Sequence, residues 1–267
     1  MRFMRIILCL KPVPDPRYWN RLGLDPETKT LIRDGIPNII NPLDKKALEA
    51  ALQLRERKGG EVITISMAPP NTTSVVREAL AMGADWSILL SDSTFAGSDG
   101  LATSYILSTA ITRLVPYHLI LCGDQTLDGA TSMVSSQIAE FLGIPNLMHV
   151  SAIEPQNSEV FRVRSQIEHG YLWAEIKPPM VLSVVKEINE PRYITLMNIL
   201  QGEEKGIQIW SSKDLSLTEP WVGLKGSPSR MADLLISTMR RKGEMLQGAP
   251  SEMAKALAER LHRWGYC

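Results

Sequence analysis

The stretch HLILCGDQTLDGATSMVSSQIAEFLGIP, residues 118–145, contains the three parts from which the fold can be predicted. Residues 118–123 form a short, nearly continuous apolar run, as expected for a strand that is covered on both faces. A polar loop with two glycines follows, and the apolar spacing then becomes helical, with a helix expected to begin near Asp128. A buried strand that leads closely into a helix is the repeating unit of parallel α/β proteins.

The same unit recurs through the first half of the chain. Apolar runs of strand length alternate with helical patterns, and Asn41, Thr72 (or Asn71) and Ser98 stand where three helices should be capped. This alternation predicts an α/β protein with an open, mostly parallel sheet and right-handed crossovers. The expected strands are 5–10, 61–67, 86–91 and 118–123, and the expected helices are 41–60, 71–83 and 98–114.

After Pro145 the pattern changes. Four β-rich runs follow one another closely, with period-2 alternation in residues 161–168 and a hairpin expected at His169 and Gly170. We expect these runs to form an antiparallel extension of the sheet. The runs are residues 148–155, 159–170, 171–179 and 180–189.

The last third of the chain is less regular. A loop after residue 189 includes a short helical turn near Leu196, and a linker rich in Ser, Pro, Gly and Lys, 211–227, precedes two amphipathic helical patterns. These patterns span 229–243 and 250–265. The expected domains are 1–205, the α/β domain with its antiparallel extension, and 206–267, a C-terminal helical arm.

Composition and charge narrow the function classes. Among 267 residues, Lys+Arg and Asp+Glu both total 29, so the formal net charge is zero and no global field favours nucleic acid. The apolar run near the start is too short for a signal sequence or a membrane span, so we expect no membrane insertion and a cytoplasmic location. Cys9, Cys122 and Cys267 lie far apart, which argues against a disulfide framework or a metal site. The four histidines are scattered, and no nucleophile–base order is evident, so no catalytic residue is predicted.

The loop after the fourth strand is the best candidate for a binding site. In open α/β sheets ligands bind beyond the carboxyl ends of the strands, and a helix starting near Asp128 would point free N–H groups at a bound anion. Gly123 and Gly129 allow close backbone approach, and Lys11 could line the same crevice. Asp124 and Asp128 would repel a phosphate unless they turn away, cap the helix or accept from ribose hydroxyls. The residues alone leave two interpretations open, a nucleotide site and an ordinary strand-to-helix turn.

Six motifs resemble those of one protein family. They are LKPVPD (10–15), NPLDKKALEAALQL (41–54), EALAMGAD (78–85), GDQTLDG (123–129), KPPMVLSVVKEINEPRY (177–193) and TLMNI (195–199). In this order, and over about residues 4–205, the chain resembles the β subunits of electron transfer flavoproteins. The resemblance implies an adenine-nucleotide-binding, Rossmann-like α/β fold and pairing with an α subunit that carries FAD.

The nucleotide contacts of that family can be carried over to this sequence position by position. They fall on the end of the first strand, the start of the first helix, the end of the second strand and the Gly-rich loop. The implied contacts are Cys9, Asn41, Pro42, Leu43, Asp44, Met67, Gly123, Asp124, Gln125, Thr126, Leu127, Asp128, Gly129, Ala130, Thr131, Ser132, Met133, Val134 and Ser135.

The resemblance leaves two candidates for the nucleotide. In the ordinary branch of the family the β subunit holds AMP, whereas in the electron-bifurcating branch the same pocket holds a second FAD that exchanges hydride with NADH. LDGATS (127–132) lacks the consecutive acidic residues of the AMP type, and GLKGSPS (223–229) also resembles the bifurcating branch. We therefore predict FAD, with AMP as the alternative, and oxidoreductase activity with NADH only in the bifurcating case.

The predicted function is that of an electron-carrier subunit, which passes electrons between flavin centres and a partner dehydrogenase. The alternative is a stand-alone adenine-nucleotide-binding sensor module of the same fold. A minimal sensor would end near residue 145, whereas this chain continues well beyond it, which favours the carrier. The apolar patterns in residues 206–267 indicate contact with the flavin-bearing α subunit.

The segment after NEPRY is the expected docking site for the dehydrogenase. Members of the family insert a Leu from this segment into a pocket of the partner, and Leu196 stands at that position. Met197 replaces the usual Pro, and GEEKG (202–206) replaces a basic run, so we expect a partner that differs from the common acyl-CoA dehydrogenases. The alternative, that Leu196 is a core residue, stays open.

Overall fold

The structure is a computed structural model that describes residues 3–25, 31–32, 35–156, 159–218, 220–230 and 243–266. The chain divides into two compact units, Met1–Leu234 and Leu235–Cys267. The first unit contains the sheet and the candidate site, and the second contains helix α6 (Pro250–Arg263). The helix expected at 250–265 is therefore confirmed, whereas most of the helix expected at 229–243 lies outside the described residues.

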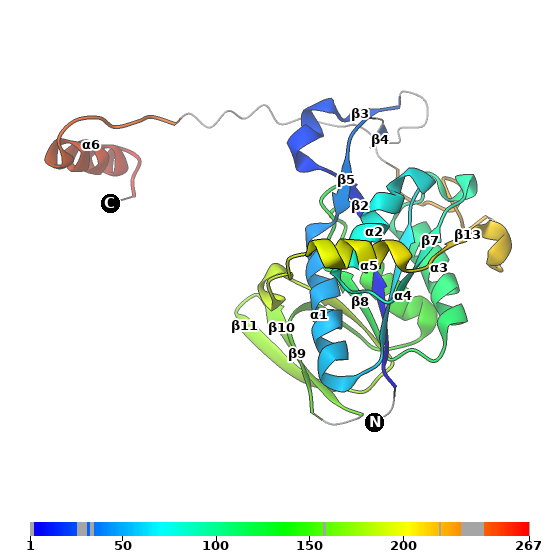
Figure 1. Ribbon diagram of the computed structural model, residues 1–267. Coiled ribbons are helices and arrows are strands. Elements are labelled where there is room, and N and C mark those ends of the chain that lie inside the picture. The colour runs from blue at the N-terminus through cyan, green and yellow to red at the C-terminus, as the bar shows by residue number, and fades with distance from the viewer. Residues whose placement is uncertain are drawn as a thin grey trace. The chain divides into compact units, whose positions relative to one another are not determined.

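Within the described residues, nine strands form one sheet in the order β11-β10-β9-β12-β8-β1-β6-β7-β13 (Figure 1). Neighbouring strands from β9 to β13 in this order run parallel, and β10 is antiparallel to both β9 and β11. The predicted fold class, an open and mostly parallel α/β sheet with an antiparallel extension, is confirmed. The strands are β1 (Arg5–Cys9), β6 (Glu61–Met67), β7 (Trp86–Leu90), β8 (Leu119–Gly123), β9 (Asn146–Pro155), β10 (Phe161–Ile167), β11 (Gly170–Ile176), β12 (Met180–Val184) and β13 (Ile207–Trp210). Two short antiparallel pairs are separate from this sheet: β2 (Pro12–Pro14) with β5 (Asn38–Ile40), and β3 (Gly23–Leu24) with β4 (Leu31–Ile32).

Helices cover both faces of the sheet. α1 and α2 share one buried core cluster with the strand residues of one face, and α3 and α4 share a second cluster with those of the other face. Helix α5 lies against α2, so closely that a Cβ added to Gly202 would stand 2.9 Å from Ala81 Cα. Among the described helices, none is long and apolar enough to cross a membrane. The helices of the first unit are α1 (Pro42–Lys58), α2 (Thr73–Met82), α3 (Gly100–Ile111), α4 (Val134–Leu142) and α5 (Leu196–Glu204).

Three elements differ from the predictions. β12 was expected to be antiparallel, but it lies between β8 and β9 and runs parallel to both, as suits a strand whose residues are all buried. β13 was not predicted, and it pairs in parallel with β7 at the edge of the sheet. The helix expected near Asp128 begins at Val134, because Ala130 and Ser132 have φ values of 47° and 53°, which a right-handed helix does not accommodate.

Smaller features follow the predictions more closely. The hairpin at His169 and Gly170 joins β10 to β11, and the helical turn near Leu196 extends into α5. α3 begins slightly later than expected, because the Asp99 carboxylate accepts from the first N–H groups of the helix. The expected linker at 211–227 falls within the first unit instead of joining two units, and its described residues bond to the rest of that unit, for example from Ser212 N to Asp92 Oδ2 at 2.9 Å.

Gly123→Ala is expected to destabilise the fold. A Cβ at this position would stand 2.4 Å from Asp44 Oδ1 and 2.7 Å from Leu43 Cβ, so the start of α1 would have to move. Overpacking of this kind costs about 1–3 kcal/mol of unfolding free energy. Gly206→Ala is the matched control, because nothing lies within 4 Å of its added Cβ. Urea unfolding followed by circular dichroism measures both variants, and equal stabilities would contradict the close packing.

Candidate functional site

The candidate site lies at the edge of the sheet where β1, β6 and β8 end. These strands are adjacent and parallel, so Cys9, Met67 and Gly123 stand at the same edge. The register of β1 with β8 places Cys9 opposite Cys122, and both are buried. A hydrogen bond with the Cys9 thiol, together with burial, raises the pKa of Cys122 well above its ordinary value. Cys122 is therefore a neutral thiol in the floor of the site.

Asp44 joins the segments that meet at this edge. Its Oδ2 accepts from Lys11 N (2.8 Å), after β1, and its Oδ1 accepts from Gly123 N (2.9 Å), at the end of β8. The side chain stands in the first turn of α1 and is buried, and burial raises the pKa of Asp44 to about 6 despite these hydrogen bonds. One carboxylate thus holds two strand ends against the start of a helix.

Asn41 holds the loop that follows β8. It was expected to cap α1, and it does precede Pro42, but its side chain makes no capping hydrogen bond. Instead its Nδ2 donates to Gln125 O (2.9 Å) and its Oδ1 accepts from Leu127 N (3.2 Å). The amide satisfies one acceptor and one donor of the loop backbone, which fixes the loop beside α1.

Both acidic side chains of the loop are paired within the protein. Lys11 Nζ donates to Asp128 Oδ1 (2.7 Å), and the Asp128 side chain is only 4% exposed. Asp124 Oδ1 accepts from Ser183 Oγ (3.0 Å) and lies 3.0 Å from His149 Nδ1. These pairings reduce the repulsion that the two carboxylates would exert on a phosphate.

His149 and Ser183 were not predicted as parts of the site. They belong to β9 and β12, which enter the sheet beside β8, and their distance from Asp124 along the chain gives no hint of the contact. The pairing of β9 with β12 shifts between Leu147 and Val150, and within this bulge His149 has a φ of 54°. The bulge brings the imidazole within reach of Asp124.

The start of α4 offers donors for an anion. Met133 stands at the cap position of α4 and has no side-chain oxygen, so the first N–H groups of the helix lack a side-chain cap. Ser135 Oγ, in the first turn, is buried and has no hydrogen-bond partner among the described residues. An uncapped helix N-terminus and a buried hydroxyl without a partner fit a phosphate-sized anion. The predicted nucleotide therefore fits this donor set, which lies further along the loop than the expected helix start at Asp128.

The other predicted residues differ in their packing and in their exposure to solvent. Leu43 packs against Gly123, and the Val134 side chain is partly buried against the core cluster beneath α3 and α4. Met67 is separated from β8 by β1, so it stands at the same edge but further from the loop. Taken as whole residues, the exposed ones of the loop are Gln125, Leu127, Gly129, Ala130, Thr131 and Met133, and the half-buried ones are Asp124, Thr126, Asp128 and Ser132, of which Asp128 has a buried side chain.

The raised pKa of Asp44 predicts a specific pH dependence. The folded-state pKa of about 6 lies above the ordinary 3.8, so the protonated carboxyl stabilises the fold fully below about pH 4, and this contribution is lost as the pH rises through 6. Between pH 5 and 7 the unfolding free energy of the wild type should fall by about 1 kcal/mol relative to that of Asp44→Asn, whose amide does not titrate. Urea unfolding at both pH values measures the difference, and parallel pH profiles would contradict it.

Comparisons with known proteins find similar chains. A family model described as "Electron transfer flavoprotein domain" matches residues 28–215. An electron transfer flavoprotein subunit beta from Thermoanaerobacterium thermosaccharolyticum is 42% identical over 97% of this chain and 98% of the relative. The caffeyl-CoA reductase-Etf complex subunit CarD of Acetobacterium woodii is 40% identical over 97% of this chain and 98% of its own length. The acryloyl-CoA reductase electron transfer subunit gamma of Anaerotignum propionicum is 36% identical, with the same coverage of 97% and 98%.

Proposed function

Since the chain belongs to the electron transfer flavoprotein family and is similar to its β subunits, we propose that it passes electrons between flavin centres and a partner dehydrogenase. The observation that carries this proposal is the similarity to a named β subunit over 98% of that subunit's length. Two further relatives are named as parts of caffeyl-CoA and acryloyl-CoA reductase systems, which supports a partner that acts on CoA thioesters.

The nucleotide that we propose for the site is FAD, bound through its ADP part. The uncapped N–H groups of α4 and the hydroxyl of Ser135 would hold the phosphates, and the exposed Gly129 leaves the loop backbone open to a pyrophosphate. The pairs Lys11–Asp128 and His149–Asp124 support this assignment, because they keep the loop carboxylates engaged away from the ligand. When bound, the flavin supplies the electron-accepting chemistry, with hydride exchange from NADH in the bifurcating case. AMP is the alternative, since one phosphate fits the same donors.

Counting the nucleotides of the purified heterodimer tests the cofactor proposal. After denaturation, chromatography of the supernatant should give two FAD per complex, because the α subunit is proposed to carry one and this chain the other. Ser135→Ala should lower the retained FAD toward one per complex, since it removes a buried donor at the start of α4. One FAD with one AMP per wild-type complex would contradict FAD in this chain and support the alternative.

Pairing with the flavin-bearing α subunit is supported by the outer strands of the sheet. On β10 and β11, Arg162 lies over the Trp173 ring at 4.2 Å and Arg164 over the Tyr171 ring at 4.7 Å, and both aromatic rings are exposed. Aromatic and arginine side chains of this kind are enriched at protein interfaces. In the second unit, α6 has no buried residue, in keeping with the proposal that residues 206–267 contact the partner subunit.

The dehydrogenase is proposed to dock near Leu196. This side chain is 73% exposed at the start of α5, so the alternative that it is a core residue is wrong. An exposed leucine among other exposed apolar side chains suits the centre of a protein interface.

Leu196→Ala should therefore slow electron transfer to the dehydrogenase about tenfold, the loss expected for a contact near the centre of an interface. Bound flavin and the melting temperature should not change, because the side chain is exposed. Stopped-flow reduction of the dehydrogenase measures the rate. Val115→Ala, which truncates an exposed apolar side chain outside both α5 and residues 206–267, is the control and should leave the rate unchanged. A fall in melting temperature, or an unchanged rate, would count against docking at this residue.

A further inference from the structure

The segment after β12 carries a patch of exposed apolar side chains. Tyr193 is 98% exposed, Leu196 73% and Met197 63%, and Ile199 and Leu200 are also exposed. These five residues are called the α5 patch here, since four of them lie on α5. A surface that has to become ordered when it binds loses part of its binding free energy. The contacts that hold α5 in place therefore determine how readily the patch can dock.

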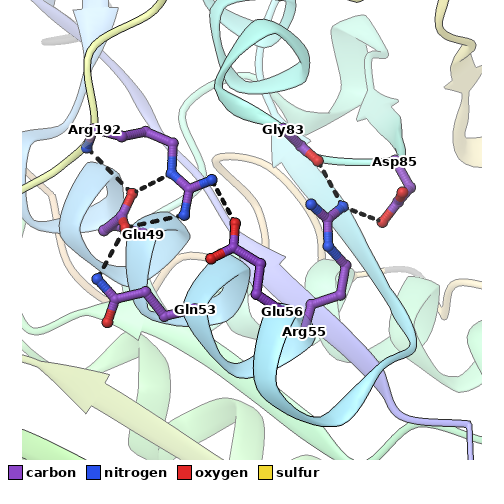
Figure 2. Close-up of polar contacts among 7 residues, drawn as sticks. All are labelled: Glu49, Gln53, Arg55, Glu56, Gly83, Asp85 and Arg192. Atoms are coloured by element: carbon purple, nitrogen blue, oxygen red, sulfur yellow. Dashed lines mark hydrogen bonds and ion pairs between the residues drawn. The ribbon is translucent and has the colours of Figure 1, made fainter.

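Arg192 ties the start of this segment to α1, as Figure 2 shows. Its Nε and Nη2 donate to the two carboxylate oxygens of Glu49, at 2.8 and 3.1 Å, and its Nη1 donates to Glu56 Oε1 at 2.6 Å. Glu49 is buried and also accepts from Gln53 Nε2, at 2.9 Å. Burial raises the pKa of Glu49, but the hydrogen bonds from Arg192 and Gln53 outweigh burial and leave the pKa below its ordinary value. Bidentate pairs of this kind fix orientation as well as distance, so Arg192 sets the path of the chain into α5.

The end of α5 is tied to α2 by reciprocal capping. Arg77, on α2, donates to three carbonyls at the end of α5, and Lys205, after α5, donates to two carbonyls at the end of α2. The bonds run from Arg77 Nη1 to Gly202 O (3.0 Å), Glu203 O (3.0 Å) and Lys205 O (2.7 Å), and from Lys205 Nζ to Leu80 O (3.0 Å) and Ala84 O (2.7 Å). Cations satisfy the last carbonyls of a helix and are favoured by its dipole, so each helix stabilises the end of the other.

α1 and α2 are joined in the same way. Arg55 Nη1, on α1, donates to Gly83 O at 2.8 Å and to Asp85 Oδ2 at 3.0 Å, just after α2 (Figure 2). The three helices α1, α2 and α5 therefore form one frame, in which guanidinium and ammonium groups bind helix ends and carboxylates. The α5 patch is held at both of its ends by this frame.

The charges around the α5 patch are mostly acidic. The exposed charged side chains of residues 186–204 are Lys186, Glu187, Glu190, Glu203 and Glu204. Three of the four glutamates have a cation nearby: Glu187 lies 3.6 Å from Lys186, Glu190 3.3 Å from Lys46 and Glu203 3.6 Å from Arg77. Lys46 and Arg77 are mostly buried, whereas the Glu190 and Glu203 side chains are exposed, so the carboxylates face the solvent and, with Glu204, set the sign of the local potential. A complementary partner surface combines an apolar pocket with lysine or arginine side chains around it.

We propose that Arg192 and the Arg77–Lys205 pair hold the α5 patch in the conformation that docks, and that the partner protein presents an apolar pocket with a basic rim. This rests on the proposed function, in which a dehydrogenase docks at Leu196. Arg192 is a positioning residue, since it acts through Glu49 and Glu56 to fix Tyr193 and the start of α5.

Hydrogen exchange on the full chain, purified with its α subunit, tests the two-ended attachment. In Arg192→Gln the backbone amides of residues 193–201 should exchange about tenfold faster, because local opening becomes easier. Arg5→Gln is the matched control: it breaks a comparable half-buried pair, Arg5–Glu61 (2.5 Å), and should leave these amides unchanged. Unchanged exchange in Arg192→Gln overturns the positioning role.

Steady-state kinetics test whether this attachment matters for docking. With a CoA-thioester dehydrogenase that accepts electrons from the wild type, Arg192→Gln should raise the KM for the dehydrogenase about tenfold at unchanged kcat and bound flavin. Arg192→Lys keeps the charge but not the bidentate geometry, so it should recover part of the loss. An unchanged KM, or a loss in kcat alone, overturns the proposal. If every dehydrogenase tried fails to accept electrons from the wild type, the proposed docking function fails, and hydrogen exchange alone then decides the attachment.

Charge reversal tests the partner's rim. Glu190→Lys and Glu204→Lys should each slow association with the same dehydrogenase about threefold at low salt, and the difference should shrink as ionic strength rises. Glu140→Lys, on α4 and hence on the opposite face of the sheet, is the control and should leave the association rate unchanged. Faster association in the first two variants, or no change, overturns the basic rim.

Discussion

The buried carboxylate of Asp44 is the constraint on which the candidate site depends. Two parallel strands end side by side, and the backbone N–H groups of Lys11 and Gly123 both need an acceptor at that edge. One carboxylate accepts from both, and it stands in the first turn of α1, where the helix dipole favours negative charge. Burial works against the charged form, as the pKa of about 6 indicates. Because the carboxylate bonds to both strand ends, these ends and the start of α1 cannot move independently, and Asn41 is held where its amide reaches the loop.

Much of the fold could be predicted, because buried parallel strands are recognisable as continuous apolar runs. β1, β6, β7 and β8 are buried over most of their length, and each lies where its run indicated. β12 has the same unbroken burial, but it follows strands that are antiparallel to one another, so its neighbours in the sequence suggested the wrong direction. β13 is short and half-exposed at the sheet edge, which makes its pattern hard to separate from a loop. Strand direction and edge pairing depend on long-range contacts that a local pattern does not contain.

Less of the site could be predicted from the sequence. Asn41 and Asp44 were placed in it by their motif, but local rules treat both as helix-start residues, whereas they bind backbone groups 84 and 79 residues further along the chain. The late start of α4 depends on the left-handed backbone at Ala130 and Ser132, and neither side chain signals that conformation. His149 enters the site only because a bulge in β9 turns it there. In each case a tertiary contact overrides the local preference.

The position of β12 bears on the choice between a subunit and a self-contained sensor. Since β12 lies between β8 and β9, the residues after 145 complete the interior of the sheet rather than extend a finished domain. Ser183 on β12 and His149 on β9 both bind Asp124, the first residue of the candidate loop. A chain that ended near residue 145 would lack both partners, and the Asp124 carboxylate would then lack these two contacts beside the proposed phosphate position. The same carboxylate connects the loop to the antiparallel extension, whose outermost strand, β11, carries exposed Trp173 and Tyr171. The candidate site is thus supported by strands next to the surface where a partner is proposed to bind. This arrangement suits a subunit that exchanges electrons across an interface better than it suits a sensor that works alone.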